Sequence, residues 1–167
     1  MKPKILHIID TFTKGGAEIL LVGSIPELNN FEHHIIYLFP TKTPIMNSVP
    51  GVVEVTCLNF TGPFDTFRIL KKINECIATI KPNIIHTHLY FSSLYIRFAK
   101  IKNIQVIQTY HSVYYRIKYP RFKARISKQL MKVVDRYSQK NNFKILHVSK
   151  TQQAANDFDV KIKNSDV

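Results

Sequence analysis

The chain has 167 residues, of which 45% are hydrophobic and 21% are charged, a balance that is typical of soluble globular proteins with one core of ordinary size. No apolar run approaches the ~18 residues of a membrane-spanning helix, and no secretory signal is recognisable, so we expect a cytoplasmic protein. The net charge of +13 favours partners that carry phosphate, whether nucleic acid, lipid headgroups or a small ligand. Cys57 and Cys76 lack metal-ligand spacing, and we expect buried free thiols rather than a disulfide.

Strand-like segments rich in Ile and Val alternate with segments of helical periodicity. The predicted strands are residues 4–9, 33–39, 53–58, 83–88, 104–110 and 143–149. Three of them are almost continuously apolar, as in strands covered on both faces, whereas 53–58 alternates and predicts one exposed face. The pattern predicts a single α/β Rossmann-like domain, an open parallel β-sheet with helices on both faces. Ligands of such sheets bind beyond the carboxyl ends of the strands.

Two predicted helices carry recognisable end signals. The first begins at Gly16, and Pro26 predicts a kink or an early stop between residues 22 and 26. Asp65 is a candidate N-cap for the second helix, which should end at Lys81-Pro82. The apolar face of that second helix should consist of Ile69, Leu70, Ile73, Ile77 and Ile80.

A double glycine, Gly15-Gly16, joins the first strand to the first helix. Glycine permits positive φ and a close approach of the backbone to a ligand, and the amides of a helix start attract anions. A phosphate or diphosphate is the expected ligand, although a plain turn explains two glycines equally well. Glu18, in the first helical turn, complements the helix dipole.

His86 and His88 are two residues apart at the end of a predicted strand, so their rings share one face. Without an acidic or cysteine partner at suitable spacing they are too few for zinc, and we expect no metal. Hydrogen bonds to a polar ligand or to neighbouring loops are the expected role.

Three further polar residues lie on strands or at their ends. His111 follows a strand, where its ring could donate to a sugar hydroxyl or serve as a satisfied loop histidine. Ser149 closes the last strand, and His7 lies within the first, where we expect a core role.

Four motifs in this order resemble the N-terminal domain of family 4 retaining glycosyltransferases, which have two Rossmann-like domains (GT-B type). The motifs are Gly-Gly-Ala-Glu at 15–18, KPNIIHTH at 81–88, VIQTYHS at 106–112 and ILHVSK at 145–150. The family transfers a sugar from a nucleotide-sugar donor to an acceptor in the cleft between two domains. The resemblance implies transfer by front-face attack within an ion pair, with retention of configuration and without a metal or other cofactor.

The resemblance also implies roles for individual residues. Gly15 and Gly16 would lie near the donor diphosphate, with Ser149 also on the donor side. His111 would approach the transferred sugar as the catalytic residue, and His86 and His88 would lie towards the acceptor.

The chain departs from the family pattern in three respects. Asn83 stands where the family commonly has Asp, which should alter only a local turn, and Ser112 replaces the usual Asp or Gly, which leaves the sugar contact open. Donor binding in the family rests mainly on a second domain, which carries a basic pair and two paired glutamates. The chain reaches KIKNSDV at 161–167 before any of these features. We therefore expect residues 1–167 to be the acceptor-side domain, inactive alone, with the C-terminal nucleotide-sugar-binding domain outside this chain.

Residues 114–140 form a basic segment that holds a net charge of +8. Its predicted basic stripe consists of Arg121, Arg125, Lys128, Lys132 and Arg136. Beside it runs an apolar stripe of Phe122, Ile126, Leu130, Val133, Val134 and Tyr137. This segment could be the solvated outer face of a helix that packs on the sheet. It could equally bind an anionic membrane, with Tyr114, Tyr115 and Tyr119 at the headgroups. Nucleic acid is not expected, because no known binding module is present.

The sequence therefore favours the N-terminal domain of a glycosyltransferase that acts on a lipid-linked or polysaccharide acceptor, in the cytoplasm or at the inner face of the membrane. The alternative is a non-catalytic membrane-binding subunit that recruits a separate catalytic chain. A nucleotide-binding oxidoreductase is disfavoured, because the G-x-G-x-x-G fingerprint is missing.

Overall fold

A computed structural model describes residues 1–42, 45, 49–111, 122–140, 142–151, 153–154 and 165–166. These residues form one parallel sheet in the order β3-β2-β1-β4-β5-β6-β7. The strands are β1 (Lys4–Ile9), β2 (Glu32–Tyr37), β3 (Val52–Cys57), β4 (Ile84–His88), β5 (Gln105–Tyr110), β6 (Phe143–His147) and β7 (Ser165–Asp166). The predicted α/β class and six of these strands are confirmed. The short β7, which pairs with β6, was not predicted.

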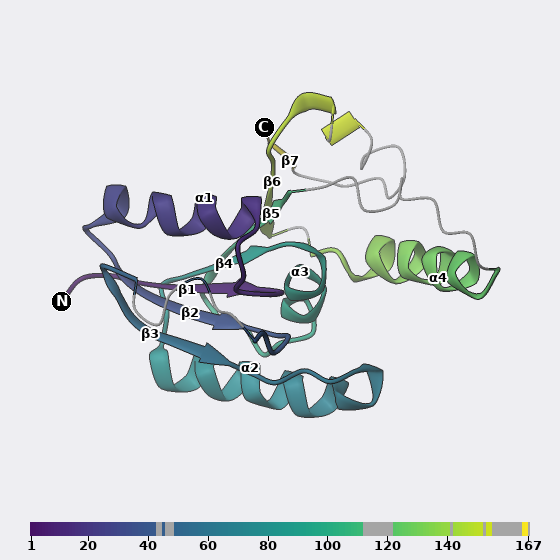
Figure 1. Ribbon diagram of the computed structural model, residues 1–167, viewed down its shortest axis with the longest axis horizontal. Coiled ribbons are helices and arrows are strands. Elements are labelled where there is room, and N and C mark those ends of the chain that lie inside the picture. The colour runs from purple at the N-terminus through teal and green to yellow at the C-terminus, as the bar shows by residue number, and fades with distance from the viewer. Residues whose placement is uncertain are drawn as a thin grey trace.

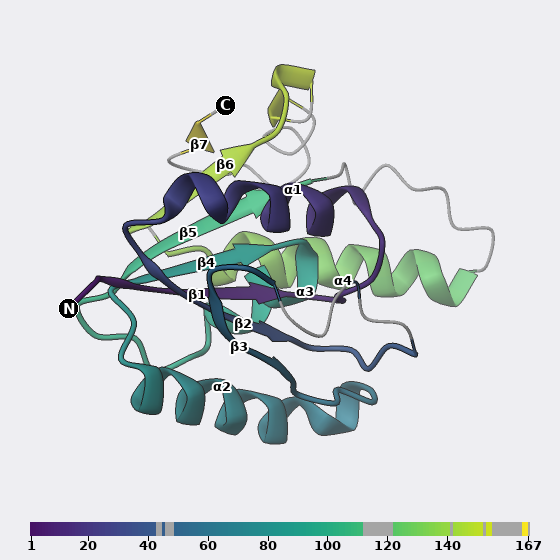
Figure 2. The ribbon, with the colours of Figure 1, turned by 60° about the vertical axis from the view of Figure 1, so that its left-hand side comes forward.

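Helices cover both faces of the sheet. Helix α1 (Gly16–Ser24) lies on one face, and α2 (Thr66–Ile80) and α3 (Tyr90–Ile96) lie on the other (Figures 1 and 2). Under α1, Ile9 and Ile35 pack with Leu21, whereas Leu6 and Ile8 pack with α2 and α3 through residues such as Ile73 and Ile96. Strand residues that alternate between faces therefore build two apolar layers.

The strand order reverses between β1 and β4. From β1 the chain passes to β2 and then β3 on one side of β1, and α2 then returns it to β4 on the other side. Connections leave β1 and β4 in opposite directions, and sheets of this kind bind ligands in a crevice at the carboxyl ends of such a strand pair. The polar residues described below gather at this point.

Several local predictions can be compared with the structure. Helix α1 ends at Ser24, and Pro26 opens a 3-10 turn (Pro26–Leu28), which confirms the early stop. In α2, Ile69, Ile73 and Ile77 are buried as predicted. Both cysteines are free, but they are half-buried rather than buried, because Cys57 ends β3 at the sheet edge and Cys76 lies at the margin of the α2 core.

The prediction that the Asp65 side chain caps α2 is wrong, because that side chain makes no hydrogen bond to a helix amide. Asp65 stands at the N-cap position, but its carboxylate accepts hydrogen bonds from Thr61 and Arg68 instead of from a helix amide. The physical reason is the 3-10 turn Pro63–Asp65, which gives Asp65 a right-handed helical backbone (φ −85°, ψ −1°) rather than the extended one of a capping residue. Hydrogen bonds from Arg68 and Thr61 lower the pKa of Asp65.

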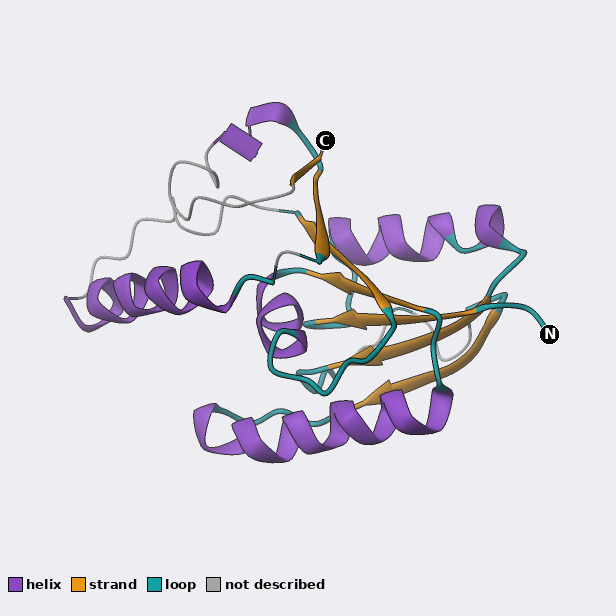
Figure 3. Ribbon diagram, turned by 180° about the vertical axis from the view of Figure 1, so that it is seen from behind, coloured by secondary structure: helices purple, strands orange, loops and turns teal. Residues whose placement is uncertain are grey.

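Helix α4 (Phe122–Ser138) lies beside α3 and extends past the carboxyl ends of the strands, as seen from behind in Figure 3. Among its described side chains, Met131 packs on Tyr90 of α3, and Asp135 makes a buried ion pair with Arg97, directly after α3. The same guanidinium donates to Tyr110 of β5. Burial raises the pKa of Tyr110, so its hydroxyl stays protonated.

Candidate functional site

Asp10, directly after β1, joins the crevice to helix α3. Its carboxylate accepts hydrogen bonds from the backbone amides of Phe91 (3.0 Å) and Ser92 (2.6 Å), in the first turn of α3. Burial raises the pKa of Asp10 to about 6, even though these amides favour the charged form. This carboxylate therefore fixes the β4–α3 junction against β1.

The same junction contains a strained residue. Leu89, between His88 and α3, has φ 73° and ψ −173°, a region that is essentially reserved for glycine. Its amide donates to the carbonyl of Thr109 at 3.3 Å, which ties the junction to β5. Backbone strain of this kind persists only where the surroundings hold it, and it is typical of functional sites.

The double glycine joins β1 to α1 without an unusual backbone conformation. Gly15 is extended (φ −128°), and neither Gly15 nor Gly16 has positive φ. A Cβ on Gly15 would overlap the carboxylate of Glu18, which folds back over it and accepts a hydrogen bond from Thr11 at 2.7 Å. Space for that carboxylate explains Gly15, because the chain turns without any unusual dihedral. A Cβ on Gly16 would meet no atom within 4 Å, so the backbone there is open to a ligand.

Five histidines follow one another across the α1 face of the sheet, and we call them the histidine row. They are His33 of β2, His7 of β1, His86 and His88 of β4, and His111 after β5. Nδ1 of His33 lies 3.0 Å from Nε2 of His7, and the ring centroids of His86 and His88 are 4.0 Å apart. The row ends at His111, whose Nε2 lies 3.4 Å from Nδ1 of His88. Three of its members, His86, His88 and His111, were predicted as site residues, and the structure brings them together.

Three members of the row, His7, His86 and His88, are held in the neutral form. Burial lowers the pKa of His86 to about 4 and the pKa values of His7 and His88 well below their usual range, and neighbouring imidazoles lower them further. His111 is half-buried, and burial lowers its pKa while the Glu18 carboxylate acts in the opposite direction. His111 is therefore the member of the row that is open to a ligand in the crevice.

Sequence reasoning missed three residues of this site. Asp10 was not proposed as a site residue, although a carboxylate directly after a strand is itself a signal. Glu18 was assigned only to the helix dipole, and Thr109, whose hydroxyl lies 2.8 Å from Nε2 of His86, was not noticed. His7 is in the core as predicted, but its pairing with His86 in the sheet register is visible only in three dimensions.

Ser149 lies apart from the histidine row. It is exposed and follows β6, which is separated from β4 by β5. Asn83 fixes the start of β4, because its side chain accepts from the amide of Lys4 at 2.8 Å, in line with a local role. Ser112 lies outside the described residues.

One alternative for the basic helix was that its apolar stripe packs on the sheet, and the structure describes part of that stripe. Val133 is 51% exposed and Tyr137 is 81% exposed, so these members of the apolar stripe do not pack on the sheet. The reason is the buried Arg97–Asp135 pair, which turns the Asp135 side of α4 towards the body. Lys132 is half-buried and Arg136 is exposed. Arg121 lies outside the described residues, as do the three tyrosines of segment 114–119, and the side chains of Arg125 and Lys128 are not described.

Within the described residues, no helix is both long enough and apolar enough to cross a bilayer.

Comparison with known proteins identifies the class. The sequence model of Glycosyltransferase Family 4 matches residues 14–153, which is most of the chain, including the double glycine and the histidines that end β4, β5 and β6. The protein belongs to this family. A comparison with curated protein sequences finds no match.

Solved structures show the same fold at low sequence identity. The chain matches sucrose-phosphate synthase from Thermosynechococcus elongatus with a TM-score of 0.68 and 16% identity, over 98% of this chain and 47% of that one. It matches UDP-N-acetylglucosamine 2-epimerase from Rickettsia bellii (TM-score 0.61, 12% identity, 93% of this chain and 41% of that one). It also matches a glycosyltransferase from Rickettsia africae with a TM-score of 0.58 and 18% identity, over 98% of this chain and 41% of that one. The fold is thus that of the N-terminal Rossmann-like domain of GT-B enzymes, and the chain spans less than half the length of these proteins.

Proposed function

We propose that this chain is the N-terminal, acceptor-side domain of a retaining glycosyltransferase. The enzyme would transfer a sugar from a nucleotide-sugar donor to a lipid-linked or polysaccharide acceptor. One observation carries the proposal beyond family membership: His111, directly after β5, contacts His88 of β4 where the strand order reverses. This contact supports a role for His111 beside the transferred sugar.

The donor diphosphate would lie at Gly16 rather than at Gly15. The start of α1 leaves its first amides without intrahelical acceptors and carries the positive end of the helix dipole. The Glu18 carboxylate already covers Gly15, whereas the backbone at Gly16 is open. A diphosphate at Gly16 would meet the amides without displacing Glu18.

His86 and His88 would act behind His111 as positioning residues on the acceptor side. His88 is 4% exposed, and its Nδ1 faces His111, so it can orient that ring without touching substrate. Thr109 in turn holds His86 through Nε2. Sugar transfer would then proceed by front-face attack within an ion pair, in which the leaving diphosphate is stabilised by the α1 amides and by cations of a second domain.

The test uses the full-length protein, including any sequence beyond residue 167. Consumption of a nucleotide-sugar should fall about 100-fold or more in His111→Ala, because the group that contacts the transferred sugar is lost. His34→Gln is the matched control, since His34 lies on β2 but on the α2 face and is bonded to Glu32. Equal activity of His111→Ala and the wild type would refute the role of His111. Turnover of donor by residues 1–167 alone would refute the need for a second domain.

A second candidate function rests on α4. The exposed Val133 and Tyr137 accompany Arg136 on a helix that extends away from the sheet (Figure 1). Such a surface suits a non-catalytic subunit that docks on an anionic membrane and recruits a catalytic chain, or an enzyme that works at that membrane.

Sedimentation with vesicles tests this membrane surface. Binding should require anionic lipid, weaken with salt, and fall in the double variant Val133→Ser/Tyr137→Ser. Phe67→Ser is the control, because Phe67 is an equally exposed aromatic residue on α2. Binding that ignores lipid charge and salt would refute the membrane surface.

A further inference from the structure

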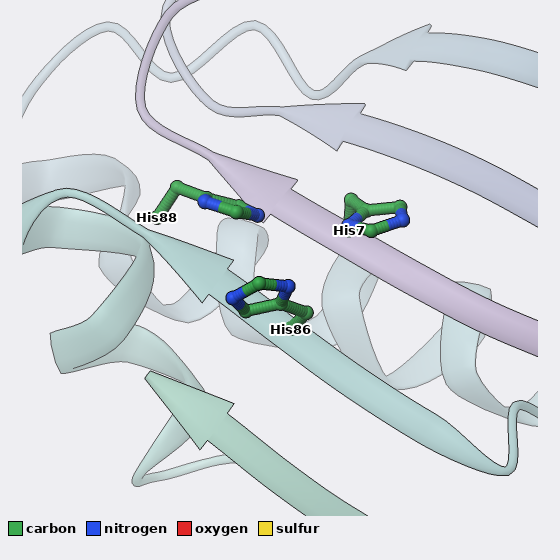
Figure 4. A group of neighbouring side chains, drawn as sticks. All are labelled: His7, His86 and His88. Carbon is green, nitrogen blue, oxygen red and sulfur yellow. The ribbon is translucent and has the colours of Figure 1, made fainter. Parts of the chain in front are cut away.

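Three imidazoles of the histidine row converge under α1. His7 of β1 is paired in register with His86 of β4, and His88 lies two residues further on, so all three share one face of the sheet. One ring nitrogen from each lies within 4.8 Å of the others. Figure 4 shows the three rings gathered on the same side of the two strands.

Two nitrogens in this cluster have no partner among the described residues. Nδ1 of His7 and Nε2 of His88 are fully buried and accept or donate no hydrogen bond there. Buried polar atoms are almost always satisfied, so two orphaned imidazole nitrogens in one cluster require an explanation. The third residue, His86, contacts Thr109 through Nε2.

Hydrogen bonds outside the cluster determine which ring nitrogen of His7 carries the proton. Nε2 of His33 can only donate to the carbonyl oxygen of Leu28, 2.9 Å away. With one proton on each ring, Nδ1 of His33 must accept from Nε2 of His7 at 3.0 Å. His7 therefore presents the lone pair of Nδ1 to the cluster. Histidines that bind metals are oriented by such outer hydrogen bonds.

We propose that His7, His86 and His88 bind one divalent transition-metal ion of the class that prefers imidazole, with Zn²⁺ as the representative. Three neutral imidazoles, with a water or another ligand in the fourth position, match the ligand set of known zinc sites. Tetrahedral zinc–nitrogen bonds of about 2.0–2.1 Å place the nitrogens about 3.3 Å apart, so they would have to approach one another by up to about 1.5 Å. The sequence alone predicted no metal, because the third ligand comes from a distant strand.

The metal would act on the crevice through His88. Coordination uses the lone pair of Nε2 in His88, so the proton of that ring stays on Nδ1 and points at Nε2 of His111. The ion would thereby fix the orientation and tautomer of the ring at the crevice. This role is structural, and it holds whether or not the proposed sugar transfer is correct.

Titration of tag-free, chelator-treated protein with Zn²⁺ tests the site by calorimetry and by thermal unfolding. We expect one equivalent to bind and the Tm to rise by about 5–10 °C at a hundredfold excess over the dissociation constant. Co²⁺ should give the visible absorption of a tetrahedral nitrogen site. His86→Gln and His7→Leu should each weaken binding about 100-fold, and His33→Phe should weaken it about 10–100-fold through the lost outer hydrogen bond.

The control is again His34→Gln, whose ring faces α2 and should leave binding unchanged. His86→Gln keeps the test valid if His7→Leu fails to fold, because His86 is only partly buried. Absence of Zn²⁺ binding would overturn the proposal and would leave a bridging water as the partner of the orphaned nitrogens. Binding that survives both ligand variants, or that His34→Gln abolishes, would equally overturn it.

Discussion

The carboxylate of Glu18 lies where a side chain on Gly15 would have to be. This relationship explains the first glycine of the pair by volume rather than by backbone conformation, because Gly15 has extended dihedrals that any residue can adopt. It also places a buried carboxyl group at the start of α1, beside the amides that would bind the donor.

Gly15→Ala should lower the free energy of unfolding by about 1 kcal/mol. The new methyl group displaces the Glu18 carboxylate, which then loses its hydrogen bond from Thr11. In urea unfolding, the cycle of Gly15→Ala, Glu18→Ala and the double variant should be clearly non-additive. Additive losses would show that the two residues do not share this space.

Gly16→Ala should impair donor binding and leave the stability of the fold nearly unchanged. Its methyl group meets no atom within 4 Å, so the free energy of unfolding should change by less than about 0.5 kcal/mol. In the full-length protein the KM for the nucleotide-sugar should rise about tenfold, because the methyl group would occupy the side from which the diphosphate approaches. An unchanged KM in a stable Gly16→Ala protein would place the diphosphate elsewhere.

Asp135→Ala should destabilise the fold by about 3–5 kcal/mol. The substitution leaves the Arg97 guanidinium buried without its ion-pair partner, which costs far more than the loss of a surface pair. Chemical denaturation measures the loss, and hydrogen exchange should show α4 opening first. Glu75→Ala, which breaks the exposed pair with Lys71, is the control and should cost less than 1 kcal/mol. If Asp135→Ala and Glu75→Ala lower the free energy of unfolding equally, the Arg97–Asp135 pair does not hold α4 on the body.

Asp10 should make stability depend on pH between about 4 and 6. Its pKa is raised in the folded state to about 6, so the folded protein binds this proton more tightly than the unfolded chain does. The resulting stability is present below the unfolded pKa near 4 and is lost as the pH rises through 6, with a total of about 2–3 kcal/mol. The difference in unfolding free energy between wild type and Asp10→Asn should show this slope. A pH-independent difference would mean that Asp10 is not perturbed by burial.

Patterns of neighbouring residues were enough to predict much of the fold. The Ile- and Val-rich runs located six strands, and Pro26 located the end of α1, because these signals depend only on local sequence. The cap at Asp65 failed because the preceding 3-10 turn changes the backbone there. The exposure of Val133 and Tyr137 was not predictable, because one buried ion pair between residues 97 and 135 decides which side of α4 faces the body.

The site was only partly predictable for a related reason. His86, His88 and His111 were found because strand ends in parallel sheets converge. Their relation to His7 depends on the register of β1 against β4, and the role of Glu18 depends on a side chain folding back over Gly15. Sequence periodicity carries no information on either contact.

The most direct test of the account is a structure of the protein with a nucleotide-sugar bound. We predict that the diphosphate contacts the backbone at Gly16 and that the sugar lies within hydrogen-bond distance of His111. A donor bound away from the start of α1, with the His111 ring out of reach of the sugar, would contradict the account.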